Sequence, residues 1–213
     1  MKVRKIGHCC LLIQTKSLTI LTDPGSFSTE QNTVTGVDVV LITHEHADHL
    51  HVGSLQEVLK NNPDAQVVTN SGVAKKLSEL GIAYSILEGR GTTDIDGVAL
   101  EAFDGKHEEI FEEIGQVQNT GYFIDGTLFY PGDSYCRPEK EVDILALPVA
   151  GPWCRVSDAI RYAISVKPRV AFPVHDGMLQ RNRIGSAHAI PEKVLKEHGI
   201  EFVVMTDGDE REF

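Results

Sequence analysis

Apolar and polar residues in the first forty positions follow one another in the short runs that are typical of strands. Residues 9–14 and 17–22 are two such runs, rich in Ile, Leu and Thr and joined across a two-residue polar turn. Residues 37–42 form a nearly continuous apolar run, Val-Asp-Val-Val-Leu-Ile. Such a run is typical of a strand covered on both faces, so we expect residues 37–42 to form a central strand.

Four later segments have the spacing of amphipathic helices. Ser54-Leu55-Gln56-Glu57 has the serine and glutamate of a capping box and predicts a helix that begins at Ser54. Residues 71–80, closed by Gly81, predict a second helix. Residues 156–164 predict a third, which ends at Lys167-Pro168, and residues 191–198 predict a fourth, which ends at Gly199.

The remaining segments again have the texture of strands, including 98–103, 122–124, 127–129, 143–149 and, as the last strand, 201–205. Asp125-Gly126 lies between two of them and predicts a tight hairpin. Strands punctuated by helices in both halves indicate an α/β fold. We expect a four-layer αββα sandwich of two mixed sheets with the helices outside, formed by one domain spanning residues 1–213.

Charge and composition narrow the class of partner. The chain has 213 residues, 41% of them hydrophobic, and its 20 basic and 31 acidic residues give a formal net charge of −11. An acidic protein has no basic field to attract a phosphate backbone, so we expect a small-molecule substrate and no nucleic acid. The sequence shows neither an apolar run long enough for a bilayer nor a signal-peptide core, which predicts a cytoplasmic protein without a membrane partner. The oligomeric state is left open.

The four cysteines support the same compartment. Cys9 and Cys10 are adjacent, Cys136 and Cys154 stand alone, and the chain contains no Cys-x-x-Cys pair. We therefore expect four reduced, ordinary thiols and neither a zinc knuckle nor a redox motif.

The most informative segment is Thr43-His44-Glu45-His46-Ala47-Asp48-His49, which holds three histidines and two carboxylates directly after the strand that ends at Ile42. Imidazole and carboxylate together suit zinc, manganese or iron. His44 and His46 are two positions apart, so a helix would point them away from each other and the segment must be a loop. Asp48 and His49 on the next turn are placed to serve a second ion.

Three more strands end in a potential ligand. Asp133 follows the strand that ends at Tyr130, His175 follows residues 170–174, and His107 follows residues 98–103. Because strand ends at one rim of a sheet present side chains to a shared cleft, we expect these residues to converge. The predicted set has seven ligands: His44, His46 and His107 for one ion, Asp48, His49 and His175 for the other, and Asp133 as a bridge.

The order His-x-His-x-Asp-His, then a later His, Asp and His, resembles the metallo-β-lactamase superfamily. Within it, the chain is similar to the small metal-dependent hydrolases related to ascorbate-6-phosphate lactonase. The likeness spans nearly the whole chain and includes Gly7-His8, Asn119-Thr120-Gly121-Tyr122, Tyr130-Pro131-Gly132-Asp133-Ser134, Ala150-Gly151-Pro152-Trp153 and Pro173-Val174-His175-Asp176. It implies an αββα sandwich with a two-metal site on one edge and places His8 near the cleft. Lys106 stands where the superfamily usually has a glycine before the third histidine.

The sequence gives no functional role to three other histidines and leaves the place of Trp153 open. We expect His51 and His198 to be ordinary, the latter in the last turn of a helix, and assign no role to His188. Trp153 follows the strand 143–149 and is compatible with either the core or an exposed rim of the substrate pocket.

The predicted reaction is hydrolysis. A hydroxide that bridges two divalent ions, zinc first and manganese or iron as alternatives, would attack an ester, lactone or phosphoester, with Asp48 as both ligand and orienting group. The sequence lacks a Gly-x-Ser-x-Gly elbow, a phosphate loop and a dinucleotide fingerprint. Three alternatives stay open: a metal-dependent nuclease, a non-catalytic metal-binding module, and flavodiiron-like oxygen chemistry, which would need a flavin partner.

Overall fold

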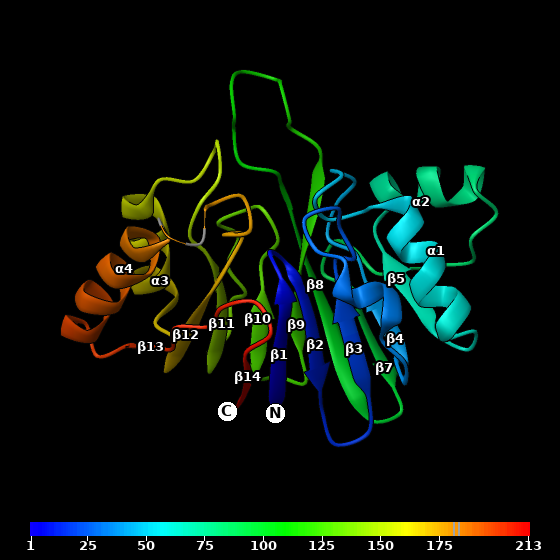
Figure 1. Cartoon of the computed structure of the whole chain (residues 1–213), viewed down its shortest axis with the longest axis horizontal. Helices are drawn as coiled ribbons and strands as arrows, with labels where there is room; N and C mark the ends of the chain where they lie inside the picture. The colour runs from blue at the N-terminus through cyan, green and yellow to red at the C-terminus, as the bar shows by residue number, and fades with distance from the viewer. Residues whose placement is uncertain (181, 183) are drawn as a thin grey trace.

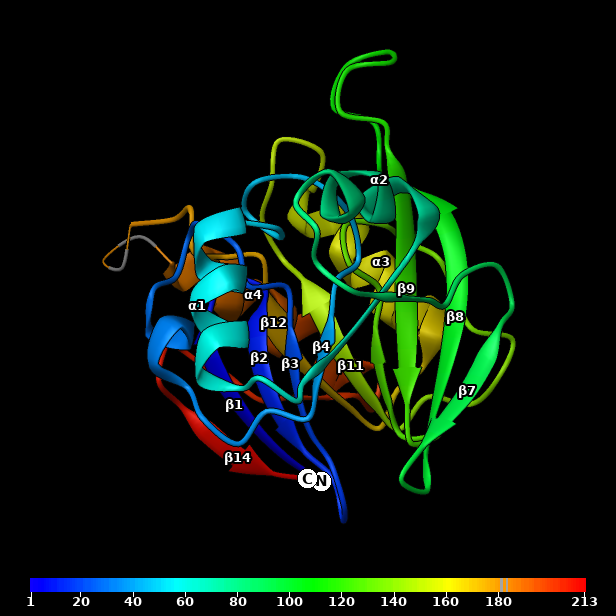
Figure 2. The ribbon, with the colours of Figure 1, turned by 90° about the vertical axis from the view of Figure 1, so that its right-hand side faces the viewer.

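Two sheets packed face to face form the centre of the molecule, with helices on both outer faces (Figures 1 and 2). This computed structural model describes all residues except 181 and 183. Helices α1 (Val52–Asn61) and α2 (Ser71–Glu79) cover the first sheet, and α3 (Val156–Val166) and α4 (Gly185–Glu197) cover the second. The expected αββα sandwich is confirmed.

Each sheet has seven strands in the described part of the chain. The first has the order β14-β1-β2-β3-β4-β5-β6, with strands β14 (Glu210–Glu212), β1 (Lys2–Gly7), β2 (Cys10–Gln14), β3 (Thr19–Thr22), β4 (Val39–Leu41), β5 (Gln66–Thr69) and β6 (Ser85–Ile86). The second has the order β13-β12-β11-β10-β9-β8-β7, with strands β13 (Glu201–Phe202), β12 (Val170–Val174), β11 (Ile144–Pro148), β10 (Leu128–Tyr130), β9 (Gln118–Ile124), β8 (Val98–Lys106) and β7 (Thr92–Ile95). A short 3₁₀ helix, η1 (Glu30–Thr33), precedes β4.

Three apolar clusters account for the layers. One lies between the sheets and includes Leu41 and Phe172, a second joins the second sheet to α3 and α4, and a third joins the first sheet to α1 and α2. Strand β4 contributes to two of them, since Val39 and Leu41 face the other sheet whereas Val40 faces the helices. The continuous apolar run predicted a strand buried on both faces, and this prediction is confirmed.

Parallel pairing brings several strand ends to one edge. In the first sheet β3, β4 and β5 are parallel, and in the second sheet β10, β11 and β12 are parallel. The carboxyl ends of parallel strands lie at the same edge, so the loops after β4, β10 and β12 can meet there. These loops carry the predicted ligands.

The hairpin at Asp125-Gly126 is confirmed. Both residues have positive φ, 51° and 58°, which is the left-handed pair that a two-residue turn of this type requires, and β9 and β10 pair across it. Helices α2 and α3 also begin and end close to the predicted positions.

Four predictions about elements are wrong. Helix α1 begins at Val52, because the ring of His51 accepts the Ser54 N–H and caps it in place of the predicted capping box. Helix α4 begins at Gly185 and includes Pro191, and β13 ends at Phe202. Strand Glu201–Phe202 is not the last strand, since β14 follows and pairs with β1, itself an unpredicted strand. This pairing places the two chain ends side by side (Figure 2).

Candidate metal centre

The loop after β4 carries the first four predicted ligands. His44 follows Ile42 at the end of the sheet, and a turn in which the His49 and Leu50 N–H groups both donate to the His46 carbonyl folds the chain back. Residues 43–51 contain no regular element, as the spacing of His44 and His46 predicted. The turn directs side chains of the same short loop toward two neighbouring positions.

The first position is formed by His44, His46 and His107. One ring nitrogen of each lies within 4.8 Å of the others, and the ring centroids are 4.6 to 5.1 Å apart. His44 and His107 are buried, whereas His46 is half-buried. Strand β8 is longer than predicted and reaches Lys106, so His107 is delivered directly from the end of the strand.

The second position is formed by Asp48, His49, Asp133 and His175, whose ligand atoms also lie within 4.8 Å of one another. His175 Nε2 is 3.5 Å from Asp48 Oδ2, and His49 Nε2 is 3.8 Å from the same oxygen. The structure thus brings all seven predicted residues together.

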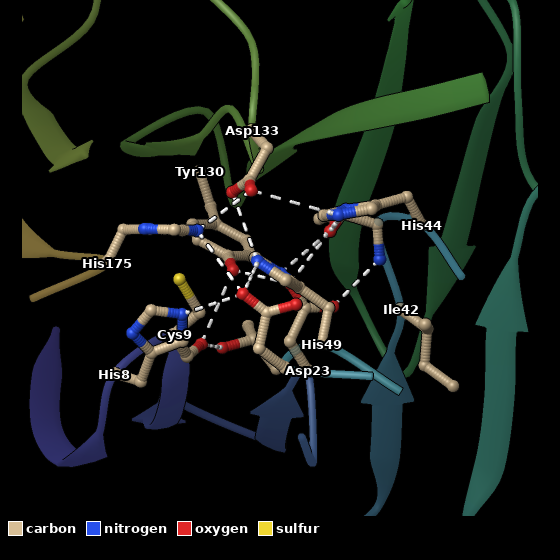
Figure 3. Close-up of polar contacts among 12 residues, drawn as sticks. His8, Cys9, Asp23, Ile42, His44, His49, Tyr130, Asp133 and His175 are labelled. Atoms are coloured by element: carbon tan, nitrogen blue, oxygen red, sulfur yellow. Dashed lines mark hydrogen bonds and ion pairs between the residues drawn. The ribbon is translucent and has the colours of Figure 1, made fainter. Parts of the chain in front are cut away.

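Asp133 lies between His44 of the first position and His49 and His175 of the second (Figure 3). Its Oδ2 is 3.2 Å from His107 Nε2 and 2.8 Å from His175 Nε2, while its Oδ1 is 3.1 Å from His49 Nε2. Gly132 precedes it with φ 63°, and a Cβ at that position would collide with Asn119 and Thr43. This glycine lets the loop after β10 approach the loop after β4.

Hydrogen bonds at Nδ1 fix the orientation of four histidines. His107 Nδ1 donates to the Glu108 carbonyl and His175 Nδ1 to the Ala150 carbonyl, both at 2.6 Å. His44 Nδ1 lies 3.0 Å from Thr43 Oγ1, and His49 Nδ1 lies 2.7 Å from Asp23 Oδ2. In the neutral form with the hydrogen on Nδ1, the Nε2 lone pair of each ring would point to the centre.

Asp23, which the sequence analysis did not single out, is the buried anchor of this arrangement. Its carboxylate accepts from Thr43 N, Thr43 Oγ1, His49 Nδ1 and the hydroxyl of Tyr130, and these contacts span both sheets. Its position directly after β3, in Thr22-Asp23-Pro24, is the same signal of a carboxylate at a strand end that identified Asp133.

Unpaired buried atoms show where a cation fits. Among the described side chains, six buried polar atoms have no partner in hydrogen-bond geometry, and four belong to this cluster: Nε2 of His44, His49 and His175 and Oδ1 of Asp133. The Nε2 atoms of His49 and His175 lie at ion-pair distance from Asp133. An orphaned buried polar atom is costly unless something else satisfies it. Imidazole nitrogens and carboxylate oxygens are ligands of zinc and similar ions, so the donor set fits divalent metal.

Electrostatics favour the metal-binding form of His44, His46 and Asp133, whereas His49 is an exception. Burial lowers the pKa of His44 well below its usual value and also lowers the pKa of His46, so both rings are neutral. Burial opposes ionisation of Asp133, but His175 and His49 outweigh it and hold its pKa well below the usual range. Burial alone would lower the pKa of His49, yet the Asp133 carboxylate, with Cys9 and Asp23, raises it well above the usual value. Metal binding needs the neutral ring and would therefore displace a proton from His49.

His8 is a buried neighbour of the ligands. The Gly177 N–H donates to His8 Nδ1 at 3.1 Å, so the hydrogen is on Nε2, which donates to Asp48 Oδ2 at 3.2 Å. Burial lowers the pKa of His8 to about 4, which keeps the ring neutral. The resemblance placed His8 near the cleft, as one candidate for the substrate pocket; in the structure His8 is buried, is not among the described residues that line the pocket, and donates to Asp48.

Trp153 and Cys9 also lie beside the predicted ligands. Trp153 is 8% exposed and its indole N–H donates to Asp133 Oδ2 at 3.1 Å, so it is both largely buried and in contact with the site. Cys9 lies beneath His8, His49 and His175, and burial raises the pKa of its thiol to about 12. All four cysteines are free thiols, as predicted.

His188, which received no role from the sequence, belongs to a separate buried network. Its Nε2 lies 2.8 Å from Asp176 Oδ2, and Lys5 Nζ lies 2.6 Å from Asp176 Oδ1. Lys5 also donates to the carbonyls of Pro173 and Met205. The network connects β1 and α4 to Asp176, the residue after His175. His175 itself has a left-handed backbone, with φ 62°.

A pocket of about 220 Å³ opens over the centre and includes His46, Asp48, His107, Asp133 and His175 in its walls. A larger hollow of about 1330 Å³ lies at the opposite, amino-terminal ends of β10, β11 and β12, and it contains none of the predicted ligands. The smaller pocket is therefore the candidate site, since it alone of the two combines space with the ligand cluster.

The chain is similar to known proteins in both sequence and structure. The family model of the beta-lactamase superfamily domain matches residues 2–175. Protein Rv0786c of Mycobacterium tuberculosis is 33% identical over 184 residues, covering 84% of this chain and 85% of that protein. The UPF0173 metal-dependent hydrolase MJ1163 of Methanocaldococcus jannaschii is 30% identical over 149 residues, covering 66% of this chain and 67% of its own.

Among solved structures, Igni18, a metallo hydrolase from Ignicoccus hospitalis, matches 100% of this chain and 98% of its own with a TM-score of 0.76 and 19% identity. At this level of identity the match establishes the fold alone. Of the helices that the structure describes, none has the length and apolar composition to cross a membrane.

Proposed function

The chain belongs to the beta-lactamase superfamily, and from this membership and the geometry of the metal centre we propose that it is a dinuclear metal-dependent hydrolase of a small molecule. The observation that carries the proposal is the convergence of the His44, His46 and His107 side chains on one position and of Asp48, His49, Asp133 and His175 on a neighbouring one. Seven ligands exceed the four that a closed structural zinc site needs, which favours catalysis over a purely structural role.

Each residue has a defined task in this proposal. His44, His46 and His107 would hold one ion, and Asp48, His49 and His175 the other, with Asp133 touching both groups. When bound, two divalent ions supply a water of lowered pKa and polarise the carbonyl or phosphoryl oxygen of the substrate. Zinc suits the histidine-rich donor set first, with manganese or iron as alternatives.

The surrounding side chains position the ligands. Asp23 and Thr43 set the rings of His49 and His44, and His8 donates to Asp48 so that this carboxylate keeps one orientation. Trp153, which lines the pocket, donates to Asp133 and so orients its carboxylate. Such outer partners commonly contribute 10- to 100-fold to metal affinity or activity.

Substrates of the proposed enzyme are small esters, lactones or phosphoesters, as in the lactonase-like branch that the sequence resembles. A pocket of about 220 Å³ admits a small molecule or the end of a larger one. The net charge of −11 disfavours binding of a nucleic acid backbone.

The proposal is tested by metal analysis of the purified protein, followed by a screen of lactones, phosphomonoesters and phosphodiesters with zinc and with manganese. We expect chelation to abolish hydrolysis and added metal to restore it. Full turnover by protein proven free of metal would refute the proposal. Submicromolar binding of RNA or DNA at physiological salt, in a mobility-shift titration, would favour the nuclease alternative instead.

A further inference from the structure

Exposed apolar side chains from three distant segments meet over the metal centre. Phe27, Ile110 and Met178 all line the pocket, although they come from the loop after β3, the segment between β8 and β9, and the loop after β12. They are 47%, 37% and 41% exposed. Large apolar side chains that gather in this way around a pocket mark a binding surface rather than scattered surface residues.

The rest of the pocket wall has the same character. Pro152 and Trp153 line it together with Phe27, Ile110 and Met178, and we call these five residues the apolar mouth. None of the described residues that line the pocket is Lys or Arg. The five side chains of the apolar mouth surround the predicted ligands, and a lining of this kind favours an uncharged group.

Ile110 comes from a segment that projects from the molecule. Residues 107–117 extend beyond the ends of β8 and β9 as a narrow hairpin beside the site (Figures 1 and 2). Phe111 and Ile114 pair across it and are 61% and 65% exposed. Glu108, Glu109, Glu112 and Glu113 lie on the same hairpin and add negative charge next to the mouth, which further disfavours an anionic substrate.

We propose that the apolar mouth binds the hydrocarbon group of a neutral carboxylic ester or lactone, and that Ile110 and Met178 set the preference for this group. The inference rests on the proposed hydrolase function and narrows its substrate class to uncharged acyl compounds. Removing a methylene group from water contributes about a fourfold gain in affinity when it is fully buried. In this open pocket we expect about tenfold for each pair of methylene groups that the mouth covers.

A binding experiment tests the mouth without turnover. Trp153 is the only tryptophan of the chain and lines the pocket, so its fluorescence reports occupancy. The metal-free protein is titrated with acetamide, butanamide and hexanamide, which are neutral and differ only in chain length. Dissociation constants should fall about tenfold from acetamide to butanamide and again to hexanamide. Equal constants for the three amides would overturn the inference.

Matched variants locate the effect. Ile110→Ser and Met178→Ser lie on different segments. Each should reduce the ratio of dissociation constants between successive amides from about tenfold to about threefold. Ile114→Ser changes the same residue type on the same hairpin but outside the pocket lining, and it should keep the wild-type step. Circular dichroism confirms that each variant is folded. Retention of the full step in both Ile110→Ser and Met178→Ser would contradict the assignment.

A turnover experiment separates this inference from the proposed function. With zinc or manganese, 4-nitrophenyl hexanoate should be hydrolysed with a kcat/KM at least tenfold above that of the acetate, and 4-nitrophenyl phosphate more slowly than either. Metal-dependent hydrolysis without length dependence, or with the phosphate preferred, would refute the mouth and leave the hydrolase standing. Failure to hydrolyse any ester, lactone or phosphoester would refute the hydrolase, while the amide titrations still decide the binding role.

Discussion

Some residues of the candidate metal centre could be predicted from the sequence, and others could not. His44, His46, Asp48 and His49 were predictable because one loop concentrates ligand types that a solvated turn does not need. The contact of Asp23 with His49 was not, since the two are 26 positions apart and only the packing of the β3 and β4 ends makes them neighbours. The tautomer of His8 likewise depends on Gly177, which arrives from the other sheet.

Asp48→Asn tests the charge of the second metal position. The amide keeps the shape of the side chain but loses the charge that attracts a cation and the symmetric acceptor that His8 orients. We expect native circular dichroism with kcat/KM reduced by at least about 100-fold. Glu45→Gln, the same change in the same loop outside the ligand set, should stay within about twofold of wild type. Wild-type activity in Asp48→Asn would show that Asp48 is neither ligand nor orienting group.

His107→Ala tests the first position. His107 comes from the second sheet, whereas His44 and His46 come from the first, so its loss should empty this position selectively. Metal analysis should fall from two ions toward one per chain, with the ion at Asp48, His49 and His175 retained. His198→Ala, at the carboxyl end of α4, serves as the histidine control. A variant that keeps both ions fully bound would show that His107 is not a ligand.

Asp23→Asn tests the anchor behind His49. The carboxylate accepts four hydrogen bonds, and an amide would turn two donor hydrogens toward donor groups. We expect zinc affinity to fall about 10- to 100-fold, measured by competition with a chromophoric chelator. Tyr130→Phe removes only one of the four donors and should have a smaller effect. An unchanged affinity in Asp23→Asn would mean that His49 needs no partner at Nδ1.

At the scale of elements, the sequence predicted those strands, turns and helix ends that residues adjacent in the chain determine. The buried run of β4, the Asp-Gly turn between β9 and β10 and the end of α3 before Pro168 follow from residues next to one another. Strand β14, Glu-Arg-Glu, has no apolar residue and is exposed, so only its pairing with β1 makes it a strand. Pro191 indicated a helix start, but α4 tolerates it after its first turns.

Lys5→Met tests the buried network that joins β1, β12 and α4. Lys5 is fully buried, and its loss would leave Asp176 with His188 as its remaining partner in the network. Removing one member of a buried pair typically costs about 3–5 kcal/mol of unfolding free energy. Lys2 lies on the same strand as Lys5 and forms an exposed ion pair with Glu210 of β14. Lys2→Met breaks this pair and should lower the unfolding free energy by at most about 1 kcal/mol. Urea unfolding measures both, and equal losses would refute a stabilising role for the buried pair.

At the scale of the whole molecule, the candidate centre lies where the two sheets meet at one edge. The loop after β4 supplies four of the proposed ligands from the first sheet, and the loops after β8, β10 and β12 supply the other three from the second. The expectation of strand ends sharing one rim predicted this convergence. The order of the layers predicted neither the hydrogen-bond partner of each histidine ring nor the apolar mouth. Both depend on loops from opposite sheets.

Metal binding should therefore stabilise the whole fold. A ligand at 100 times its dissociation constant adds about 2.7 kcal/mol to the unfolding free energy, and for a chain of this size that corresponds to a rise in Tm of about 5–10 °C. Zinc, added to metal-free protein, should produce this rise because the ion would link loops of both sheets. Magnesium prefers oxygen ligands and should produce little.

Calorimetry with His175→Ala completes the test. This variant keeps the four ligands of the β4 loop but loses one from the second sheet, so zinc should raise its Tm by less than half of the wild-type shift. Any binding of zinc to the unfolded chain reduces both shifts alike, so the difference between the two proteins isolates the link between the sheets. Tight zinc binding with no rise in the Tm of the wild type, or the same rise in both proteins, would show that the ions do not join the two sheets.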